Sequence, residues 1–455
     1  MLPKRYPDRD EIAAVRAVAE TVEPGEEDEG HSFRLAGRVM ARREMGKITF
    51  LDLVDRSGRI QLLAPKVDVD LGDIVGVRGH PAKSRRGEPS LKVVDLELLA
   101  KNRAPLPDTF HGLTDTELRY RKRYLDLLMN DERRGDFLAR ATMLRAIRGY
   151  LDGEGFVEVE TPALQADYGG AFARPFVTHH NELERDVYLR IAGGELYLKR
   201  LLVGGLEKVY EIGRVFRNEG ISYKHNPEFT MLEWYEAYAD YRDTMARFEE
   251  LVERAALEVN GTTAVAYRGH ELELKRPWRR LRLVEALDEH GLWTRDADEL
   301  RRRLEARGTD TGADRTWAQL VDHAVTTYVE PSLIQPTFLH DYPVELSPFA
   351  RSSDGDERIV ERFEGFAGGT ELCNAFSELN DSEEQAERFR MQSQEGAGGN
   401  VEAEPGDPDY VEALSYGMPP AGGLGLGIDR LAMLLTGRES IRDVILFPAL
   451  RERPG

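Results

Sequence analysis

The chain has 455 residues, of which 41% are hydrophobic and 32% charged, and its formal net charge is −20. This composition is typical of a charge-rich globular protein with two or three domains. No run of about 18 apolar residues occurs, which excludes a membrane-spanning helix. Cys373 is the only cysteine, which excludes internal disulfides and zinc sites with two or more thiolates. We expect a cytoplasmic protein with no membrane partner, because the N-terminal residues lack the apolar core of a signal peptide.

The charge is unevenly distributed. Residues 1–30, an acidic N-terminal segment, carry −5, residues 31–105 carry +6, and the remaining 350 residues carry −21. A basic module inside an acidic chain favours a polyanionic partner for that module.

Within 31–105, five stretches alternate apolar and polar residues: FRLAGRVMA, ITFLDLV, RIQLLA, IVGVRG and SLKVVDLELL. Five short strands at this spacing predict a Greek-key barrel of the OB type, which binds oligonucleotides on one face. The alternative is another small all-β domain.

A second domain follows at 106–455, after the linker-like KNRAPLPDTFHG at 101–112. Its strands and helices do not alternate regularly, which favours an α+β fold over a doubly wound sheet. SQEGAGGNVEAEPGDPD at 393–409 is typical of a loop, and FVEVETP at 156–162 predicts a strand. Helical spacing occurs at 117–131, 141–156, 243–258, 283–290, 297–306 and 316–328.

Two common nucleotide-binding patterns are missing from the sequence: a Walker A loop, and a G-x-G-x-x-G loop in GGLGLGIDR at 422–430. FRNEGISYKHNPEFTMLEWYEAY at 216–238 offers another route. Period-2 geometry gives a hairpin in which Arg217 faces Phe229, Glu233 and Tyr235 around a turn at Gly220. Arginine suits a phosphate, an aromatic ring suits a base, and a carboxylate suits an amine. The pattern predicts a pocket for a nucleotide beside an amino acid, the alternative being a solvated hairpin with scattered charge.

Three segments, in order, resemble the motifs of class II aminoacyl-tRNA synthetases: GFVEVETP, FRNE with HNPEF, and GLGLGIDR. YRKRYLDL, GGAFARPFVTHHN, ELYLKRLLVGG, ELCNAFSELND and SIRDVILFP are similar to the lysyl-tRNA synthetases of bacterial type. The resemblance implies an OB-fold barrel before a catalytic domain with an antiparallel sheet flanked by helices. It implies a homodimer that uses ATP, L-lysine, tRNA(Lys) and Mg²⁺.

The resemblance also implies roles for individual residues. Arg217 and Arg430 are the catalytic cations at the ATP phosphates, and Glu364 and Glu371 hold magnesium. The remaining ATP-binding residues are Glu219, Lys224, His225 and Phe229, and the lysine-binding residues are Glu195, Glu233, Tyr235, Asn374, Phe376 and Glu378. No protein nucleophile is needed, because the lysine carboxylate attacks the α-phosphorus and the site supplies positioning and positive charge.

The spacing of three of these residues supports the assignment. Asn374, Phe376 and Glu378 are two apart and share one strand face, whereas Glu371 breaks this parity, so we expect a bulge between 371 and 374. A buried structural ion pair is the alternative for Glu233 or Glu378.

In the barrel, the resemblance implies that Phe50 stacks on an anticodon base and that Gln61 and Glu88 read base edges. The alternative for Phe50 is a core position, which its flanking pattern does not exclude.

Three features depart from the family pattern. Ala192-Gly193-Gly194-Glu195 is one residue longer than the usual Ala-Pro-Glu, Lys224 replaces an arginine, and only APKVDVDLGD joins the third and fourth barrel strands. Three other functions are possible. An inactive synthetase-like RNA-binding or regulatory protein would have no need to retain the phosphate and metal groups. A lysine-activating paralogue with a non-tRNA acceptor is disfavoured by the basic barrel for a protein acceptor and by the missing membrane spans for a lipid acceptor. An aspartyl- or asparaginyl-tRNA ligase would need a cation where this pocket has Glu233 and Glu378.

Overall fold

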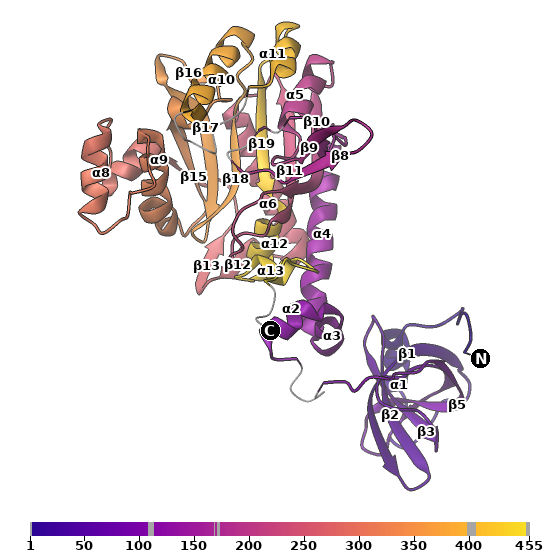
Figure 1. The fold of residues 1–455 in the computed structure, drawn as a ribbon. Helices are drawn as coiled ribbons and strands as arrows, with labels where there is room; N and C mark the ends of the chain where they lie inside the picture. Colours follow the sequence, from indigo (N-terminus) through magenta and orange to yellow (C-terminus); the bar gives the residue numbers. More distant parts are fainter. Residues whose placement is uncertain (1, 108–112, 168, 171–172, 398–405, 452–455) are drawn as a thin grey trace. The chain divides into compact units, whose positions relative to one another are not determined.

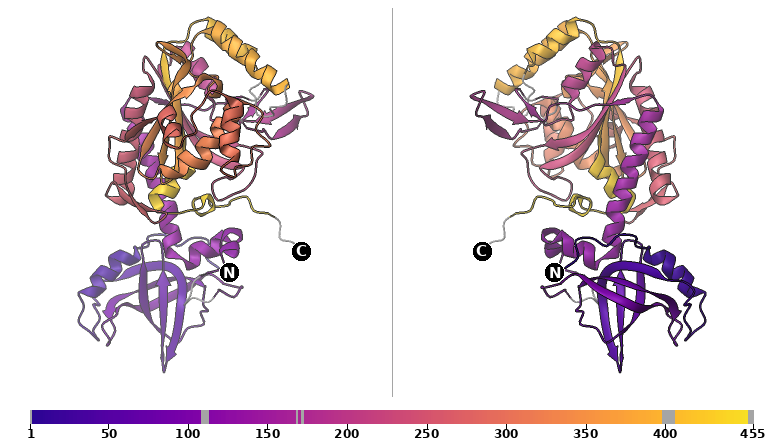
Figure 2. Two further views of the ribbon diagram at one scale, coloured as in Figure 1. Left: turned by 90° about the vertical axis from the view of Figure 1, so that its left-hand side faces the viewer. Right: turned by 90° about the vertical axis from the view of Figure 1, so that its right-hand side faces the viewer.

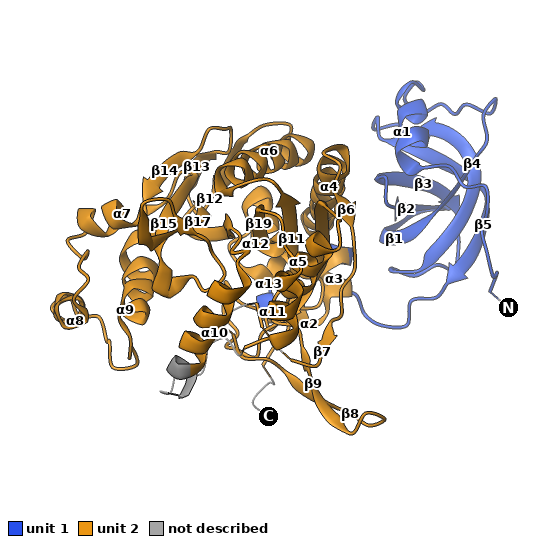
Figure 3. Cartoon of the chain, turned by 90° about the horizontal axis from the view of Figure 1, so that it is seen from above, with its two compact units in different colours: residues 1–116, 128–130 blue, residues 117–127, 131–455 orange. Residues whose placement is uncertain are grey.

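The computed structural model describes residues 2–107, 113–167, 169–170, 173–397 and 406–451. It divides into two compact units (Figure 3): residues 1–116 with 128–130, and residues 117–127 with 131–455. The expected linker at 101–112 lies partly outside the described residues. Within the described ranges, no helix is both long and apolar enough to cross a membrane.

Unit 1 is a closed barrel with the strand order β1-β2-β3-β5-β4, which confirms the OB-type prediction. Its strands are β1 (Phe33–Met45), β2 (Ile48–Val54), β3 (Arg59–Pro65), β4 (Ile74–Lys83) and β5 (Pro89–Ala100). Residues 66–73, which join β3 to β4, contain no helix.

Sequence analysis missed helix α1 (Ile12–Glu20), which lies inside the acidic segment. Ile12 and Val15 are fully buried and belong to the same core as Leu35 and Leu51 of the barrel. The helix is therefore part of the barrel's hydrophobic core, and its acidic neighbours remain on the surface.

The centre of unit 2 is a sheet with the order β14-β15-β17-β18-β19-β11-β10-β6 (Figure 1). Its central pairs are antiparallel, as predicted, but β14 with β15 and β10 with β6 are parallel pairs at the two ends. The strands are β6 (Val157–Glu158), β10 (Lys208–Phe216), β11 (Glu228–Ala237), β14 (Arg279–Arg282), β15 (Thr337–Pro343), β17 (Asp356–Ala367), β18 (Thr370–Ser377) and β19 (Ala421–Gly427), with β16 (Ser352–Ser353) beside β17.

The alternation of side chains along β11 separates a core face from a site face. Leu232 and Trp234 are fully buried in the main core, to which α4 (Asp131–Gly153), α6 (Tyr241–Asn260) and α12 (Ile428–Thr436) contribute. Tyr235, on the other face, packs with residues of α5 (Glu195–Val203), α10 (Ser382–Ala397) and α11 (Pro408–Ser415). Figure 2 shows α4 and α6 together on one side of the sheet.

Between β14 and β15 the chain forms a helical insertion that shares a second hydrophobic core with strands β14, β15 and β17 of the sheet. It consists of α7 (Leu283–Glu289), α8 (Ala297–Glu305), α9 (Trp317–Ala324), η1 (Val325–Val329) and η2 (Glu330–Ser332). The smaller elements are α2 (Thr116–Arg121), α3 (Arg123–Met129), β7 (Leu164–Gln165), β8 (Val177–His180), β9 (Arg185–Leu189), β12 (Ala264–Tyr267), β13 (His270–Glu273), η3 (Val344–Leu346) and α13 (Ile441–Val444).

Some predicted boundaries were wrong. Residues 393–397 belong to α10 and the chain is helical again from Pro408, so the expected loop at 393–409 is shorter, and 398–405 lie outside the described residues. Helix α4 begins ten residues before the expected start, and the strand expected at 156–162 is only β6.

Candidate functional site

A cavity of about 710 Å³ opens on the site face of the sheet. Every residue of the second domain that the resemblance singled out lines it. These residues are Glu195, Arg217, Glu219, Lys224, His225, Phe229, Glu233, Tyr235, Glu364, Glu371, Asn374, Phe376, Glu378 and Arg430.

The predicted hairpin is formed by β10 and β11, with Val215 opposite Phe229 and Glu211 opposite Glu233. The expected tight turn at Gly220 is wrong, because β10 ends at Phe216 and residues 217–227 form a longer loop. Arg217 nevertheless lies over the ring of Phe229, with its guanidinium carbon 5.3 Å from the ring centroid. Its Nε donates to the carbonyl of Ile191 at 3.1 Å, which fixes the guanidinium beside the aromatic plate.

A second arginine, Arg430, enters the cavity from α12. Its Nη1 donates to a carboxylate oxygen and to the carbonyl of Glu371, both at 2.9 Å. The preceding residue, Asp429, is 2% exposed, and it accepts hydrogen bonds from the backbone N–H of Thr230 at 2.7 Å and from Arg140 at 2.6 Å. Asp429 thus joins the start of α12 to β11. This contact fixes the backbone of Arg430 relative to that of Phe229, because each is next to one of the bonded residues.

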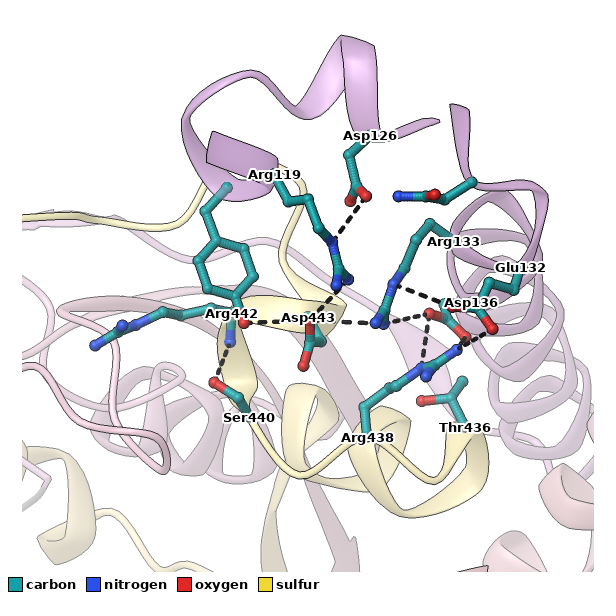
Figure 4. Close-up of polar contacts among 12 residues, drawn as sticks. Arg119, Asp126, Glu132, Arg133, Asp136, Thr436, Arg438, Ser440, Arg442 and Asp443 are labelled. Carbon is teal, nitrogen blue, oxygen red and sulfur yellow. Dashed lines mark hydrogen bonds and ion pairs between the residues drawn. The ribbon is translucent and has the colours of Figure 1, made fainter. Parts of the chain in front are cut away.

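The far end of α12 is held by a charged network outside the cavity (Figure 4). Arg438 pairs with Asp136 of α4 at 2.8 Å, and Arg133 pairs with Asp136 at 3.2 Å. Tyr120 donates to Asp443 at 3.2 Å. Both ends of the helix that carries Arg430 are therefore anchored to neighbouring helices.

Two carboxylates lie between the arginines and the helical insertion. Glu364 accepts from Arg362 at 2.6 Å and from the hydroxyl of Tyr342 at 2.8 Å, while Glu371 is paired with Arg430. Burial raises the pKa of Glu364, Arg362 opposes the rise, and Glu371 adds to it. A carboxyl whose pKa is raised by burial and by a second carboxylate is a site that a cation would stabilise.

The predicted bulge is confirmed. Gly365 pairs with Cys373 and Phe366 pairs with Glu371, so Leu372 is the extra residue of β18. The bulge lets Glu371 and Asn374 line the same cavity despite the odd spacing.

The other end of the cavity is acidic. Glu233 is 4% exposed, and its Oε1 accepts from the backbone N–H of Gly193 at 2.6 Å. Its Oε2 has no hydrogen-bond partner among the described residues. Burial, with a smaller contribution from Glu195, raises the pKa of Glu233 to about 8. A buried carboxyl with an unused oxygen is able to accept an ammonium group.

Two more carboxylates at this end already have a cation. Lys199, which sequence analysis did not single out, lies 2.6 Å from Glu195 and 2.6 Å from Glu378. The alternative, in which Glu378 belongs to a buried ion pair, is thus partly confirmed: Glu378 pairs with Lys199, but it also lines the cavity.

The loop residues at the arginine end of the cavity have partners of their own. Lys224 pairs with Glu330 of η2 at 2.7 Å, and Ser222 Oγ lies 2.9 Å from His225 Nδ1. Burial, with Arg430 and Lys224, lowers the pKa of His225, so the imidazole is neutral near pH 7. Glu219 is exposed at the cavity edge.

In the barrel, β2 places Thr49, Leu51 and Leu53 inside, whereas Phe50 is only half-buried and does not belong to the described barrel core. The alternative reading of Phe50 as a core residue is therefore not supported. Gln61 donates to Ser90 at 2.9 Å.

Glu88 completes the predicted set of barrel residues. Its side chain is about half exposed, and it pairs with Arg16 of α1 at 3.3 Å. Ser90, which accepts from Gln61, donates in turn to the carbonyl of Glu88 at 2.9 Å. A chain of contacts therefore links two of the three predicted base readers on the barrel.

Several described residues that contact the predicted set were not predicted from the sequence, and Lys199 and Arg362 are the charged ones that each join two members of it. Lys199 follows Glu195 at the i,i+4 spacing of a helix, and Arg362 precedes Glu364 by two on a strand, so each had one local signal. Their second partners, Glu378 and Asn374, lie on other elements and have no such signal in the sequence.

Comparison with known proteins gives two family matches. Residues 115–451 match the family described as tRNA synthetases class II (D, K and N), and residues 33–99 match the OB-fold nucleic acid binding domain. The lysine–tRNA ligase of Moorella thermoacetica is 52% identical over 443 residues, covering 94% of this chain and 90% of its own. Those of Pelotomaculum thermopropionicum and Halalkalibacterium halodurans are 51% and 50% identical, covering 92% and 94% of this chain and 86% and 88% of theirs.

Proposed function

The chain belongs to the lysine–tRNA ligases of the class II tRNA synthetases, and from this premise we propose how its own residues carry out the reaction. The ligase joins L-lysine to tRNA in two steps: lysine and ATP form lysyl-adenylate and pyrophosphate, and the acyl group then passes to the terminal ribose. The assignment of residues rests on one observation: the same cavity has Arg217 and Arg430 at one end and the carboxyl groups of Glu195, Glu233 and Glu378 at the other.

At the phosphate end, Arg217 and Arg430 bind the α- and γ-phosphate regions, and Phe229 stacks on adenine. The 5.3 Å contact between Arg217 and the Phe229 ring supports this placement, because only the ribose separates the base from the α-phosphate in ATP. Both arginines stabilise negative charge that develops as the pyrophosphate leaves. Glu219, Lys224 and His225 line the same end and assist.

Glu364 and Glu371 are the residues that would hold Mg²⁺. Mg²⁺ is usually bound by one or two carboxylates together with substrate phosphates, which is the number of carboxylates that this pair offers. Bound there, the ion neutralises phosphate charge. Arg362, which contacts Glu364 at 2.6 Å and Asn374 at 3.0 Å, holds a magnesium ligand and a lysine-pocket residue in register.

At the acidic end, Glu233 accepts an ammonium group of lysine through its unpartnered oxygen. Tyr235, Asn374 and Phe376 form the surrounding walls, and Glu195 with Glu378 complete the negative charge. The substrate carboxylate then points toward the arginines, which is the orientation that attack on the α-phosphorus requires.

On the barrel, we assign Phe50 as the stacking plate, and Gln61 and Glu88 as edge readers, for the anticodon of tRNA(Lys). The outward, half-buried position of Phe50 supports this. We also propose a two-fold homodimer, because the exposed side chains of Leu138, Val157 and Leu164 lie on α4 and in or next to GFVEVETP (155–162), the first of the three motifs, which supplies the interface in this class.

Two assays test the proposal on the full chain. ATP–pyrophosphate exchange should require L-lysine and stop when Arg217 is changed to Gln, whereas Arg254→Gln, on the outer side of α6, should change nothing. Exchange that survives Arg217→Gln within about fivefold would contradict the phosphate assignment, since a lost charge-assisted contact costs about 2–3 kcal/mol.

A further inference from the structure

A buried lysine, Lys199, lies directly behind the acidic end of the cavity. Its side chain is 0% exposed, and its ammonium lies 2.6 Å from a carboxylate oxygen of Glu195 and of Glu378. Both carboxylates line the cavity, whereas Lys199 is not among its described lining residues. Lys199 can therefore influence a bound amino acid only through the side chains in front of it.

Aromatic rings enclose the same ammonium. Its nitrogen lies between 4.9 and 5.9 Å from the ring centroids of Phe349, Phe376, Tyr235 and Tyr410. Cation–π attraction offsets part of the cost of removing an ammonium from water. Three of these rings also line the cavity, so Lys199 contacts the wall of the pocket from behind.

The charges at this end can be counted. Glu195, Glu233 and Glu378 provide three carboxylates, and Lys199 provides the buried ammonium paired with two of them. When a bound ammonium ligand favours the ionised form of all three carboxyls, two negative charges remain uncompensated by Lys199, which equals the number of ammonium groups on free lysine. Without Lys199 the three carboxylates would face one another with one excess charge, which disfavours their ionised forms.

We propose that Lys199 is a positioning and specificity residue: its ammonium holds Glu195 and Glu378 in place and matches the charge of the pocket to an amino acid with two ammonium groups. The proposal rests on the assignment of this end of the cavity to lysine. It predicts that loss of the Lys199 charge weakens the preference for an ε-ammonium rather than weakening every function of the site equally.

A purely structural role is the competing explanation. A buried ion pair can often be replaced by apolar residues of similar volume at little cost. If Lys199 only filled space, a methionine would serve nearly as well, and any loss on substitution would follow the loss of folded protein. The two explanations therefore differ in substrate selectivity.

The test compares Lys199→Met, which removes the charge, with Lys199→Arg, which keeps it. Lys208→Met is the matched control, because Lys208 pairs with Glu236 at 2.8 Å and neither is among the described residues of the cavity. ATP–pyrophosphate exchange gives KM for L-lysine and for ATP. The Ki of 6-hydroxy-L-norleucine, in which a hydroxyl replaces the ε-ammonium, measures the preference for charge.

For Lys199→Met we expect KM for lysine to rise roughly 30-fold or more, with KM for ATP changed less than about twofold, since one buried charge loses its partner. The ratio of the hydroxy analogue's Ki to the KM for lysine should fall about tenfold. Lys199→Arg should keep this ratio within about threefold, as should Lys208→Met.

An unchanged ratio in folded Lys199→Met would overturn the proposal, as would a Lys199→Arg variant that loses selectivity. If Lys199→Met does not fold, the ratio measured for Lys199→Arg decides alone. Glu233→Gln separates this inference from its premise: if that variant uses lysine normally, the pocket assignment itself is wrong. If Glu233→Gln fails as expected while the Lys199 ratios stay constant, only the role of Lys199 is refuted.

Discussion

Replacing Glu233 with Gln should impair lysine activation and, at alkaline pH, stabilise the ligand-free protein. Gln keeps an oxygen that can accept the 2.6 Å hydrogen bond from Gly193, but it places an amide NH₂ where Glu233 has its buried, unpartnered oxygen. An ammonium left without its buried partner costs about 3–5 kcal/mol, so kcat/KM for lysine should fall roughly 10²- to 10³-fold.

The opposite effect on stability follows from the pKa of Glu233. Burial raises it from 4.5 to about 8, so the folded state retains a proton that the unfolded state loses above pH 4.5. Stability from this group is present below pH 4.5 and is lost as pH rises to about 8. The total loss is roughly 5 kcal/mol at pH 9, on the order of 1.4 kcal/mol for each unit of pKa shift.

The glutamine variant avoids this loss. It should therefore melt at a higher Tm than the parent at pH 9 and at a similar Tm at pH 5, while its lysine-dependent exchange is crippled at both. Glu236→Gln is the control, because Glu236 lies on the same strand but faces Arg247, which contacts it at 2.7 Å. A loss of lysine kcat/KM below about fivefold, or a lower Tm at pH 9, would refute the reasoning.

Three further predictions concern other parts of the chain. Phe50→Ala should weaken tRNA aminoacylation roughly 5- to 150-fold and leave lysine-dependent exchange unchanged, since base stacking is worth about 1–3 kcal/mol; a parallel fall of both activities with a lower Tm would show that Phe50 acts as a structural residue. Lys224→Arg should retain or modestly raise exchange activity, because a guanidinium can keep the pairing with Glu330 and meet phosphate in two places; a large loss would show that the loop depends on the ammonium. Sedimentation at micromolar concentration should give a two-fold dimer, and an active monomer would contradict that assembly.

The parts of the site that could be predicted from sequence are those determined by period-2 geometry. Asn374, Phe376 and Glu378 are two apart and share a strand face, and the parity break at Glu371 located the bulge from the sequence alone. Hydrophobic periodicity gave the insertion helices to within a few residues, except that π-helix η1 (Val325–Val329) replaces the last turn expected in 316–328.

What the sequence could not provide were pairings between distant elements. Helix α1 was not predicted because its apolar side is short and its surroundings in the sequence are strongly acidic. The burial of Ile12 and Val15 depends on their contact with the barrel core, which the local sequence does not reveal. Likewise Lys224 was expected at phosphate, but its contact with Glu330, 106 positions later, depends on how the insertion returns to the sheet. Such contacts are set by tertiary packing, for which local pattern carries no signal.

The one-residue-longer loop before Glu195 shows how a departure from a family pattern can be accommodated. Gly194 has a φ of 104°, and a Cβ there would lie 2.4 Å from Thr161 Oγ1, while a Cβ on Gly193 would lie 2.9 Å from the Glu233 carboxyl carbon. Glycine is therefore required at both positions, for conformation and for space. The extra residue is absorbed in a left-handed turn that still starts α5 at Glu195, and it brings the Gly193 N–H onto Glu233. The longer loop thus supplies a backbone hydrogen bond to the carboxylate that we assign to the substrate ammonium.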